Sequence, residues 1–361
     1  MNIRLVKLLD AAIGRIAAYV IPAPSRLLPP SEVTSLLIIR PGGIGDAVLF
    51  ATSIQSIKNR YPSSKITVLA EKRNAGIFSL IAGVDKLLCY DHPREFLQAL
   101  GGSYDVVIDT EQWHHLSAVV ARFASAPVKI GFDTNGRRRM FTHKIPYSHD
   151  DYEALSFANL LEPLGIGADV VAMEAPLLLI QNSTSSKIDY LLEPLNNQPF
   201  VSIFPGASIP VRQWGAERFR RVAEQLSAYG IKIVVVGGKV DRLQGDVIAD
   251  GELALNLAGM TSLSETSAII QQSSLLLSGD SGVLHIAVGL GVPTVSLFGP
   301  GREKKWAPRG ERHRVINNQL PCSPCTTFGN TPKCPIDGQC MRDITVDEVV
   351  NSVTMLLSMT S

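Results

Sequence analysis

A carboxylate, a hydroxyl and an imidazole lie close together in residues 279–300, GDSGVLHIAVGLGVPTVSLFGP. The pattern predicts a strand end, a short turn, a helix and a second strand. Asp280, Ser281 and Gly282 would stand at the helix N-terminus, where free amides and the helix dipole favour an anion. Helical spacing places Ser281 and His285 on one face. We therefore predict a site for a phosphorylated, hydroxyl-rich ligand; the alternative is that Asp280 caps the helix and His285 belongs to the core.

A second chemical segment, PGGIGDAV at residues 41–48, joins a predicted strand to a predicted helix. Gly43 and Gly45 allow a ligand to approach the backbone closely. Asp46 would start the helix, either as a cap or as a general base that stays ionised there. The first two glycines imitate a dinucleotide fingerprint, but Val48 stands at its third position, so the pattern argues against a nicotinamide site.

Two further turns of the second half could hold a nucleotide sugar. In FPGASIPVRQW, residues 204–214, Ser208 and Arg212 are placed to reach a phosphate, and arginine grips phosphate with two nitrogens. In VVVGGKVDR, residues 234–242, Gly237 would admit a flat base and Asp241 would accept from ribose hydroxyls. The alternative for Arg212, taken alone, is an ordinary surface arginine.

A basic run in the first half, GRRRM at residues 136–140, could bind an anionic acceptor. We expect Arg137, Arg138 and the nearby Lys144 to contribute, although such runs are often solvated surface. No DxD motif is present, and Asp109-Thr-Glu111 is as well explained by a cap at a strand end. A catalytic divalent cation is therefore not expected, and Arg212 and the helix N-terminus would carry the charge of a leaving diphosphate.

Four of the five cysteines cluster late in the chain with the spacing C-x2-C-x8-C-x5-C. Four thiolates with one tight pair could hold a structural zinc ion, although the longer spacings are not those of a standard finger. The alternative is a reduced loop without metal. The residues concerned are Cys322, Cys325, Cys334 and Cys340.

The elements that must position these residues alternate between strand and helix from residue 35 onward. Short apolar runs such as LLIIR (36–40) and SLLLSGD (274–280) read as buried strands separated by helical segments. We therefore predict an α/β protein with two doubly wound, Rossmann-like domains that face each other across a ligand-binding cleft. The expected boundaries are 1–30 for an amphipathic helix and linker, 31–180 and 181–344 for the two domains, and 345–361 for a C-terminal helix.

The bulk composition fits such a protein and excludes other classes. The 361 residues are 45% hydrophobic and 19% charged, and the net charge of +1 gives no field for nucleic acid. Charges interrupt the apolar N-terminal stretch at residues 3–21, so it suits neither a signal peptide nor a membrane-spanning helix. It is expected to lie either on a membrane surface or on the body of the protein. The few cysteines suggest a reducing compartment.

The segments LLIIRPGGIGDAVLFATSIQSIKNRYPSSKITVLAE and DSGVLHIAVGLGVPTVSLFGP resemble glycosyltransferase family 9, the ADP-heptose lipopolysaccharide heptosyltransferases. The likeness covers roughly residues 35–350. It implies the GT-B fold, with the acceptor on the first domain and the nucleotide sugar on the second. It also implies a metal-independent enzyme of the cytoplasmic side of the inner membrane, which transfers heptose from ADP-heptose to a lipopolysaccharide-core or related glycolipid acceptor.

Carried over by position, Asp46 would be the catalytic base of an inverting displacement. Arg212, where the family often has lysine, would hold the diphosphate, and the 280–285 motif would hold the donor. Asp241 lies where the family often has glutamate, which leaves its ribose role less secure. Two alternatives remain at this level: a nucleotide-sugar epimerase or nicotinamide oxidoreductase of similar layout, and a sugar-nucleotide binding protein without catalysis.

Overall fold

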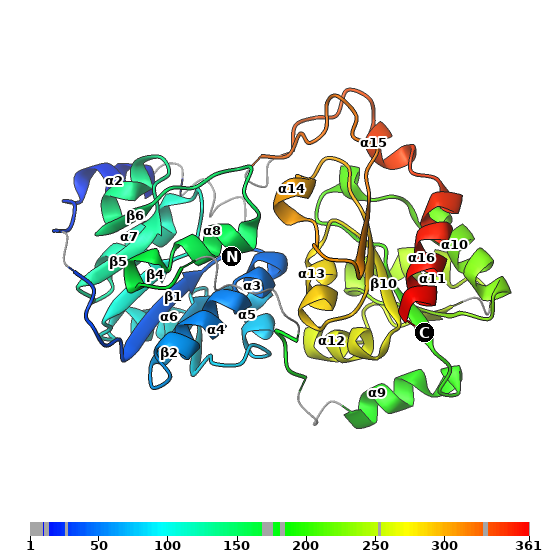
Figure 1. Cartoon of the computed structure of the whole chain (residues 1–361), viewed down its shortest axis with the longest axis horizontal. Helices are drawn as coiled ribbons and strands as arrows, with labels where there is room; N and C mark the ends of the chain where they lie inside the picture. Colours follow the sequence, from blue (N-terminus) through cyan, green and yellow to red (C-terminus); the bar gives the residue numbers. More distant parts are fainter. Residues whose placement is uncertain are drawn as a thin grey trace. The chain divides into compact units, whose positions relative to one another are not determined.

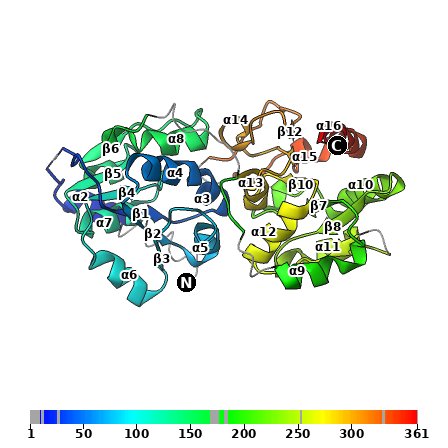
Figure 2. The same ribbon diagram turned by 60° about the horizontal axis from the view of Figure 1, so that its bottom comes forward.

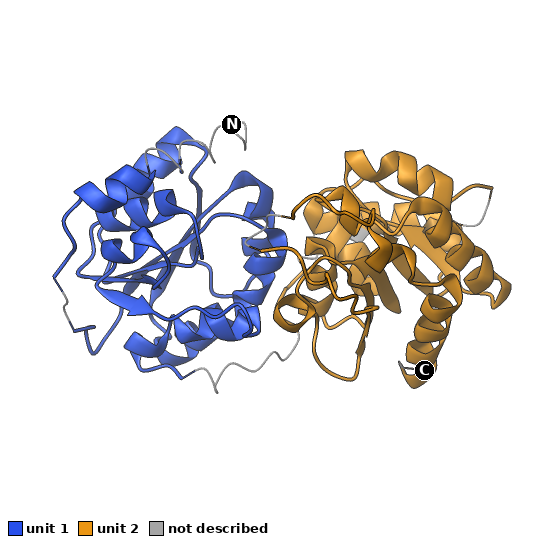
Figure 3. Cartoon of the chain, turned by 90° about the horizontal axis from the view of Figure 1, so that it is seen from above, with its two compact units in different colours: residues 1–173 blue, residues 174–361 orange. Residues whose placement is uncertain are grey.

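The computed structural model describes residues 10, 14–25, 28–167, 176–180, 185–251, 254–327 and 331–360. The chain divides into two compact units, Met1–Met173 and Glu174–Ser361, which Figure 3 colours separately. The sequence prediction had placed this boundary between residues 180 and 181. Most of the predicted N-terminal amphipathic helix lies outside the described residues, and its last part is helix α2, Arg15–Val20.

The first unit is built on a parallel six-stranded sheet in the order β3-β2-β1-β4-β5-β6. The central strand β1, SLLIIR, is apolar except at its two ends and is buried along nearly its whole length, as expected for a strand covered on both faces. The six strands are β1 Ser35–Arg40, β2 Lys65–Ala70, β3 Lys86–Cys89, β4 Val106–Asp109, β5 Val128–Phe132 and β6 His143–Ile145.

Helices cover both faces of this sheet. On one face, α6 and α7 contribute Ala99, Ala118 and Ala121 to the core cluster that also holds Leu37 and Val107. On the other face, α4 and α8 lie together, as Figure 2 shows. The helices of this unit, after α2, are α3 Ile44–Leu49, α4 Ala51–Arg60, α5 Lys72–Phe78, α6 Pro93–Leu100, α7 His115–Phe123 and α8 Glu153–Asn159, with a 3-10 turn η2 at Gly136–Met140.

The second unit repeats the plan with a parallel sheet in the order β12-β11-β10-β7-β8-β9. Figure 1 labels β10 of this sheet. Its largest core cluster joins Val201, Ile203 and Leu277 of the sheet to Phe219 of α10 and Val353 of α16. The strands are β7 Phe200–Phe204, β8 Lys232–Val235, β9 Leu255–Asn256, β10 Leu275–Gly279, β11 Thr294–Leu297 and β12 His313–Ile316.

Its helices also form two layers, with α10, α11 and α16 packed together and α9, α12 and α13 packed together. They are α9 Ser185–Leu192, α10 Ala216–Ala228, α11 Arg242–Ile248, α12 Leu263–Gln272, α13 Gly282–Gly289, α14 Glu303–Trp306, α15 Gln339–Arg342 and α16 Val346–Thr360, with 3-10 turns η7 at Pro210–Arg212 and η8 at Lys239–Asp241.

When the strands of each unit are numbered from one, the first sheet reads 3-2-1-4-5-6 from β3, and the second reads the same from β9. This is the order of doubly wound dinucleotide-binding folds. The predicted fold class is thereby confirmed for each unit. In such sheets ligands bind at the carboxyl ends of the strands, near the point where the strand order reverses. In the first unit that point lies between β1 and β4, and in the second between β7 and β10.

Candidate functional site

The first unit places Asp46 at the carboxyl end of its central strand. Strand β1 ends at Arg40, the chain turns through Gly42 with a φ of +111°, and Asp46 lies in the first turn of α3. A positive φ of this size is accessible to glycine and strained for other residues, so Gly42 allows the tight turn. The side chain of Asp46 is 18% exposed and therefore open to a substrate.

The guanidinium of Arg40 fixes the Asp46 carboxylate. Its Nη2 lies 2.6 Å from Asp46 Oδ2, and its Nη1 donates to the carbonyl of Thr110 at 2.8 Å. Burial works against the charge of Arg40, but Asp46, with Glu111 and other carboxylates nearby, raises its pKa above the usual value. A permanently charged arginine thus orients an exposed carboxylate, which is suited to accept a proton from a hydroxyl group.

The residues predicted to bind an acceptor differ in how exposed they are. Gly43 is the N-cap of α3, and a Cβ atom there would stand 3.6 Å from Asp46 Oδ2, so the glycine leaves room beside the carboxylate. Gly45 lies within the first turn of α3. The Arg138 side chain is 59% exposed, and Lys144 is exposed on β6. None of these four residues is buried, so their acceptor-binding roles stay predictions.

The prediction for Arg137 is wrong. Its side chain is fully buried, and its Nη2 lies 2.5 Å from Asp109 Oδ2. The guanidinium also lies over the Phe141 ring, 5.1 Å from its centroid. Arg137 therefore balances a buried carboxylate and supports the sheet edge, where no acceptor can reach it.

Sequence reasoning did not assign Arg40, Glu111 or Trp113 to the surroundings of Asp46. Arg40 had a readable signal, because a charged residue at the end of an otherwise apolar strand must find a buried partner or the solvent. Glu111 was seen only as a possible cap, and its partners are described below. Trp113 gave no signal of periodicity, because it lies in an irregular turn after β4.

In the second unit the predicted donor residues lie at the carboxyl ends of three strands, β7, β8 and β10. Arg212, at the end of η7, places its Nη1 2.9 Å from Asp280 Oδ2. Burial raises the pKa of Asp280, and the charge of Arg212 opposes that shift. Arg212 Nε is buried without a hydrogen-bond partner among the described residues, whereas Asp280 Oδ2 is compensated by its ion pair with Arg212. A ligand that accepted a hydrogen bond from Arg212 Nε would relieve a cost of about 1–3 kcal/mol.

Ser281, and not Asp280, caps helix α13. Its Oγ accepts from the Leu284 amide at 3.2 Å and lies 2.9 Å from Ser278 Oγ. Because the cap is supplied by a neutral hydroxyl, the helix dipole remains available to an anion at this end, where Gly282 begins the helix.

His285, predicted to touch the donor, is only 4% exposed. Burial lowers its pKa to about 4, so the imidazole is neutral at physiological pH. In this structure His285 is a core residue of α13, as the alternative reading of the sequence had it, rather than an open ligand contact.

Asp241 braces two loops at the same edge. Its Oδ2 accepts from the Gly238 amide at 2.8 Å, and burial raises its pKa while that hydrogen bond lowers it. A Cβ on Gly206 would collide with the Asp241 carboxylate, so a larger residue there would displace that side chain. Gly237 lies beside this contact, whereas Ser208 stands in an exposed turn. The nucleotide-binding roles of Gly237, Asp241 and Ser208 stay predictions.

The four clustered cysteines are free thiols. Burial raises the pKa of Cys325 and of Cys340, and the neighbouring thiolates raise both further. Among the described residues, no group of three or more His, Cys, Asp or Glu side chains is arranged so that it could hold a metal ion. The structural zinc stays a prediction.

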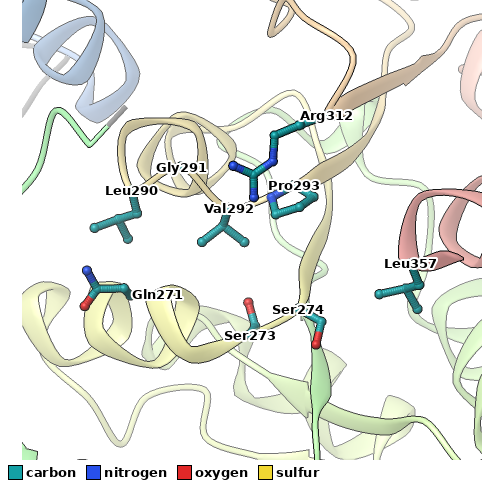
Figure 4. A pocket seen from close by; sticks show the side chains of 9 residues that line it. All are labelled: Gln271, Ser273, Ser274, Leu290, Gly291, Val292, Pro293, Arg312 and Leu357. Carbon is teal, nitrogen blue, oxygen red and sulfur yellow. The ribbon is translucent and has the colours of Figure 1, made fainter. Parts of the chain in front are cut away.

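A cavity of about 320 Å³ lies elsewhere in the second unit (Figure 4). Ser273 and Ser274 precede β10, and Pro293 precedes β11, so the cavity opens at the amino ends of the strands. Arg212 and Asp280 lie at the opposite ends of these strands. The cavity is therefore separate from the loops that carry Arg212 and Asp280.

Across the part of the chain that the structure describes, no helix is both long and apolar enough to traverse a bilayer.

The comparisons with known proteins agree with this geometry. The model of the family described as "Glycosyltransferase family 9 (heptosyltransferase)" matches residues 94–334. Lipooligosaccharide heptosyltransferase 2 of Haemophilus ducreyi is 26% identical over 353 residues, which cover 90% of this chain and 99% of that protein. Lipopolysaccharide heptosyltransferase 3 of Escherichia coli is 28% identical over 289 residues, 73% of this chain and 83% of that protein.

The fold is also shared with a solved heptosyltransferase. The structure of Escherichia coli ADP-heptose lps heptosyltransferase II superposes with a TM-score of 0.73 at 23% identity, covering 90% of this chain and 99% of that chain. The likeness extends over both units and shows the GT-B fold, with its two Rossmann-like domains.

Proposed function

The chain belongs to glycosyltransferase family 9, and we propose that it transfers heptose from ADP-heptose to a lipopolysaccharide-core or related glycolipid acceptor. The names of its relatives support this donor and acceptor. The observation that carries the proposal is a carboxylate held by a buried arginine in one unit and a cation at an anion-friendly helix end in the other. Membership of this family disfavours the epimerase, the nicotinamide oxidoreductase and the non-catalytic binding protein.

In the proposed reaction, Asp46 accepts the proton of an acceptor hydroxyl while that oxygen attacks the anomeric carbon of the donor. Arg40 holds the carboxylate in one orientation. Attack from the face opposite the leaving group inverts the anomeric configuration. The bond between the anomeric carbon and the diphosphate oxygen breaks, and the nucleoside diphosphate leaves.

We place the departing diphosphate beside Arg212 and the amide end of α13. Arg212 Nε, which has no hydrogen-bond partner in the described chain, is a free donor for a phosphate oxygen. Asp280 would accept from donor hydroxyls. The two cationic features can balance the leaving charge, so the reaction is proposed to need no metal or organic cofactor.

We further propose that the protein contacts the inner-membrane surface through α2. This short helix packs on α7 and η2, yet Ile16, Tyr19 and Val20 are 65%, 56% and 74% exposed. The Arg139 guanidinium lies over the Tyr19 ring, 5.7 Å from its centroid, which places a cation beside these apolar side chains. Apolar and basic groups together favour an anionic lipid surface. No role in nucleic-acid binding is proposed.

The test of the function is transfer by the purified protein with ADP-heptose and a heptose-deficient lipopolysaccharide-core acceptor. Asp46→Asn should lower kcat by about 10²–10⁴-fold, because the amide cannot accept the proton. Donor binding, measured by calorimetry with ADP, should stay unchanged, because Asp46 lies in the other unit. Lys58→Met is the control, since it removes the ion pair of Lys58 with Asp85 in the same unit. Turnover of Asp46→Asn at the wild-type rate would remove Asp46 from its role.

A further inference from the structure

A tryptophan stands exposed at the carboxyl edge of the first sheet. Trp113 follows β4 by a few residues, and its side chain is 45% exposed, whereas the chain's Trp214 is only 4% exposed. The exposed part of this large side chain is apolar surface that a ligand could cover. The position is notable because the neighbouring residues Glu111 and Gln112 are both buried.

The turn that carries Trp113 is held on both of its sides. The Glu111 carboxylate accepts from the amides of Gln112 and Trp113 at 3.0 and 3.1 Å. The carbonyls of Gln112 and Trp113 accept from Thr134 Oγ1 at 2.7 Å and Asn135 Nδ2 at 2.8 Å. Burial favours the protonated form of Glu111, but Arg40 and other cations hold its pKa below the usual value. The indole is thus presented from a fixed backbone.

This turn lies next to the loop that carries the proposed base. Strand β4 pairs directly with β1, so the two loops leave the sheet from neighbouring strands, which are spaced by about 4.8 Å. Arg40 connects them, since one of its nitrogens contacts Asp46 and another donates to the carbonyl of Thr110. The loops that carry Asp46 and Trp113 therefore lie next to each other at the carboxyl edge of the sheet.

Exposed cations flank the pair along the same edge. Arg73 follows β2, on one side of β1, and its side chain is 52% exposed and paired with Glu71. Arg138 follows β5, on the other side of β4, and its side chain is 59% exposed. The order along the edge is therefore Arg73, Asp46, Trp113 and Arg138.

A single rigid indole between two arginines suits a charged saccharide better than a lipid chain or an apolar protein surface. The C–H groups of a sugar ring carry partial positive charge and pack on the negative face of an aromatic ring. Arginine pairs with phosphate groups on such a sugar. A membrane or protein contact would instead call for a contiguous apolar patch.

We propose that Trp113 is the stacking surface for a saccharide ring of the acceptor, adjacent to the sugar whose hydroxyl Asp46 deprotonates. The proposal rests on the proposed glycosyl transfer and names a subsite for its acceptor. Arg138 and Arg73 hold anionic substituents on either side. Trp113 is a binding residue and takes no part in proton transfer.

The experiment compares Trp113→Ala, Trp113→Phe and a control, Tyr229→Ala. Tyr229 is also an exposed aromatic residue, 72% exposed, but it lies at the end of α10 in the second unit. With a delipidated, phosphorylated core oligosaccharide as acceptor, Trp113→Ala should raise the acceptor KM about tenfold, the scale of one good aromatic contact. The KM for ADP-heptose and kcat at saturating acceptor should change little, Trp113→Phe should restore most of the affinity, and Tyr229→Ala should resemble wild type.

Binding of the same oligosaccharide without donor gives a second readout that needs no turnover. In the wild-type protein, bound oligosaccharide should protect Trp113 from acrylamide quenching. In Trp113→Ala, the affinity for the oligosaccharide should fall about tenfold, as the acceptor KM rises. If wild type transfers heptose but Trp113→Ala keeps the wild-type acceptor KM, the subsite is refuted while the function stands. Loss of binding to anionic vesicles with an unchanged acceptor KM would assign Trp113 to a membrane contact instead. If wild type transfers no sugar, the function fails and the subsite with it.

Discussion

Acidification from pH 7 to pH 5 is expected to destabilise the second unit through the buried His285 and the half-buried His313. Burial lowers the pKa of His285 and of His313 to about 4, compared with 6.5 for a free imidazole. The charge of Arg312 adds to the shift at His313. Between these pKa values the unfolded chain binds protons that the folded chain excludes, so stability is complete above pH 6.5 and is lost as the pH falls towards 4.

The size of the effect follows from the two pKa values. One such histidine costs about 2 kcal/mol of unfolding free energy at pH 5 and about 0.2 kcal/mol at pH 7. The two together therefore remove roughly 3.5 kcal/mol between pH 7 and pH 5. This is a large part of the 5–15 kcal/mol that is typical of a folded domain, so it should be easy to measure.

Urea unfolding at pH 7, 6 and 5 is the assay. In a Trp113→Phe background the two remaining tryptophans, Trp214 and Trp306, both lie in the second unit and report on it alone. His285→Gln should abolish about half of the pH dependence, while His92→Gln, at an exposed site of the first unit, should leave it unchanged. A free energy of unfolding that stays constant between pH 7 and pH 5 would refute the burial argument. So would a His285→Gln variant with the wild-type pH dependence.

Three other outcomes are expected. Asp10 Oδ1 accepts from the Leu116 amide at 2.7 Å and so caps α7 from a distant part of the chain. Asp10→Ala should therefore lower the free energy of unfolding by about 1 kcal/mol and speed amide exchange at Leu116. Unchanged exchange at Leu116 would contradict the cap. Protein purified without chelators should contain about one zinc ion per chain if the four clustered cysteines bind metal, and replacing one of them by serine should release it; elemental analysis that finds no metal in wild type ends that prediction. Anionic vesicles should co-sediment the wild-type protein, and Ile16→Ser with Val20→Ser should weaken this, while equal binding of wild type and variant would exclude α2 as the contact.

Much of the architecture was predictable because buried parallel strands leave a simple signal. Runs such as LLIIR and SLLLSGD are apolar on both faces, and both became central strands, β1 and β10. The strands β6 and β12 were missed. Each lies at an edge of its sheet and has only three or four residues, HKI and HRVI, in which polar side chains interrupt the apolar pattern.

The site was less predictable because its partners come from distant segments. The sequence indicated that Asp46 and Arg212 lie at strand ends, and the structure places them there. It did not indicate that Arg40 would hold Asp46, because the pairing depends on how tightly the chain turns through Gly42. Arg137 was misjudged for a related reason: a run of three arginines suggests solvent, yet the 3-10 turn directs one of them inward to Asp109.

The contact between Arg40 and Asp46 has a consequence for the catalytic cycle. In the proposed reaction, proton uptake by Asp46 would remove the negative charge that lies 2.6 Å from the buried guanidinium. Arg40 is almost completely removed from water and keeps its own charge, so its guanidinium favours a negatively charged partner. The partial exposure of Asp46 gives water a route to carry the proton away. If Asp46 is the base, as we propose, Arg40 favours the return of its carboxyl group to the ionised form before the next acceptor binds.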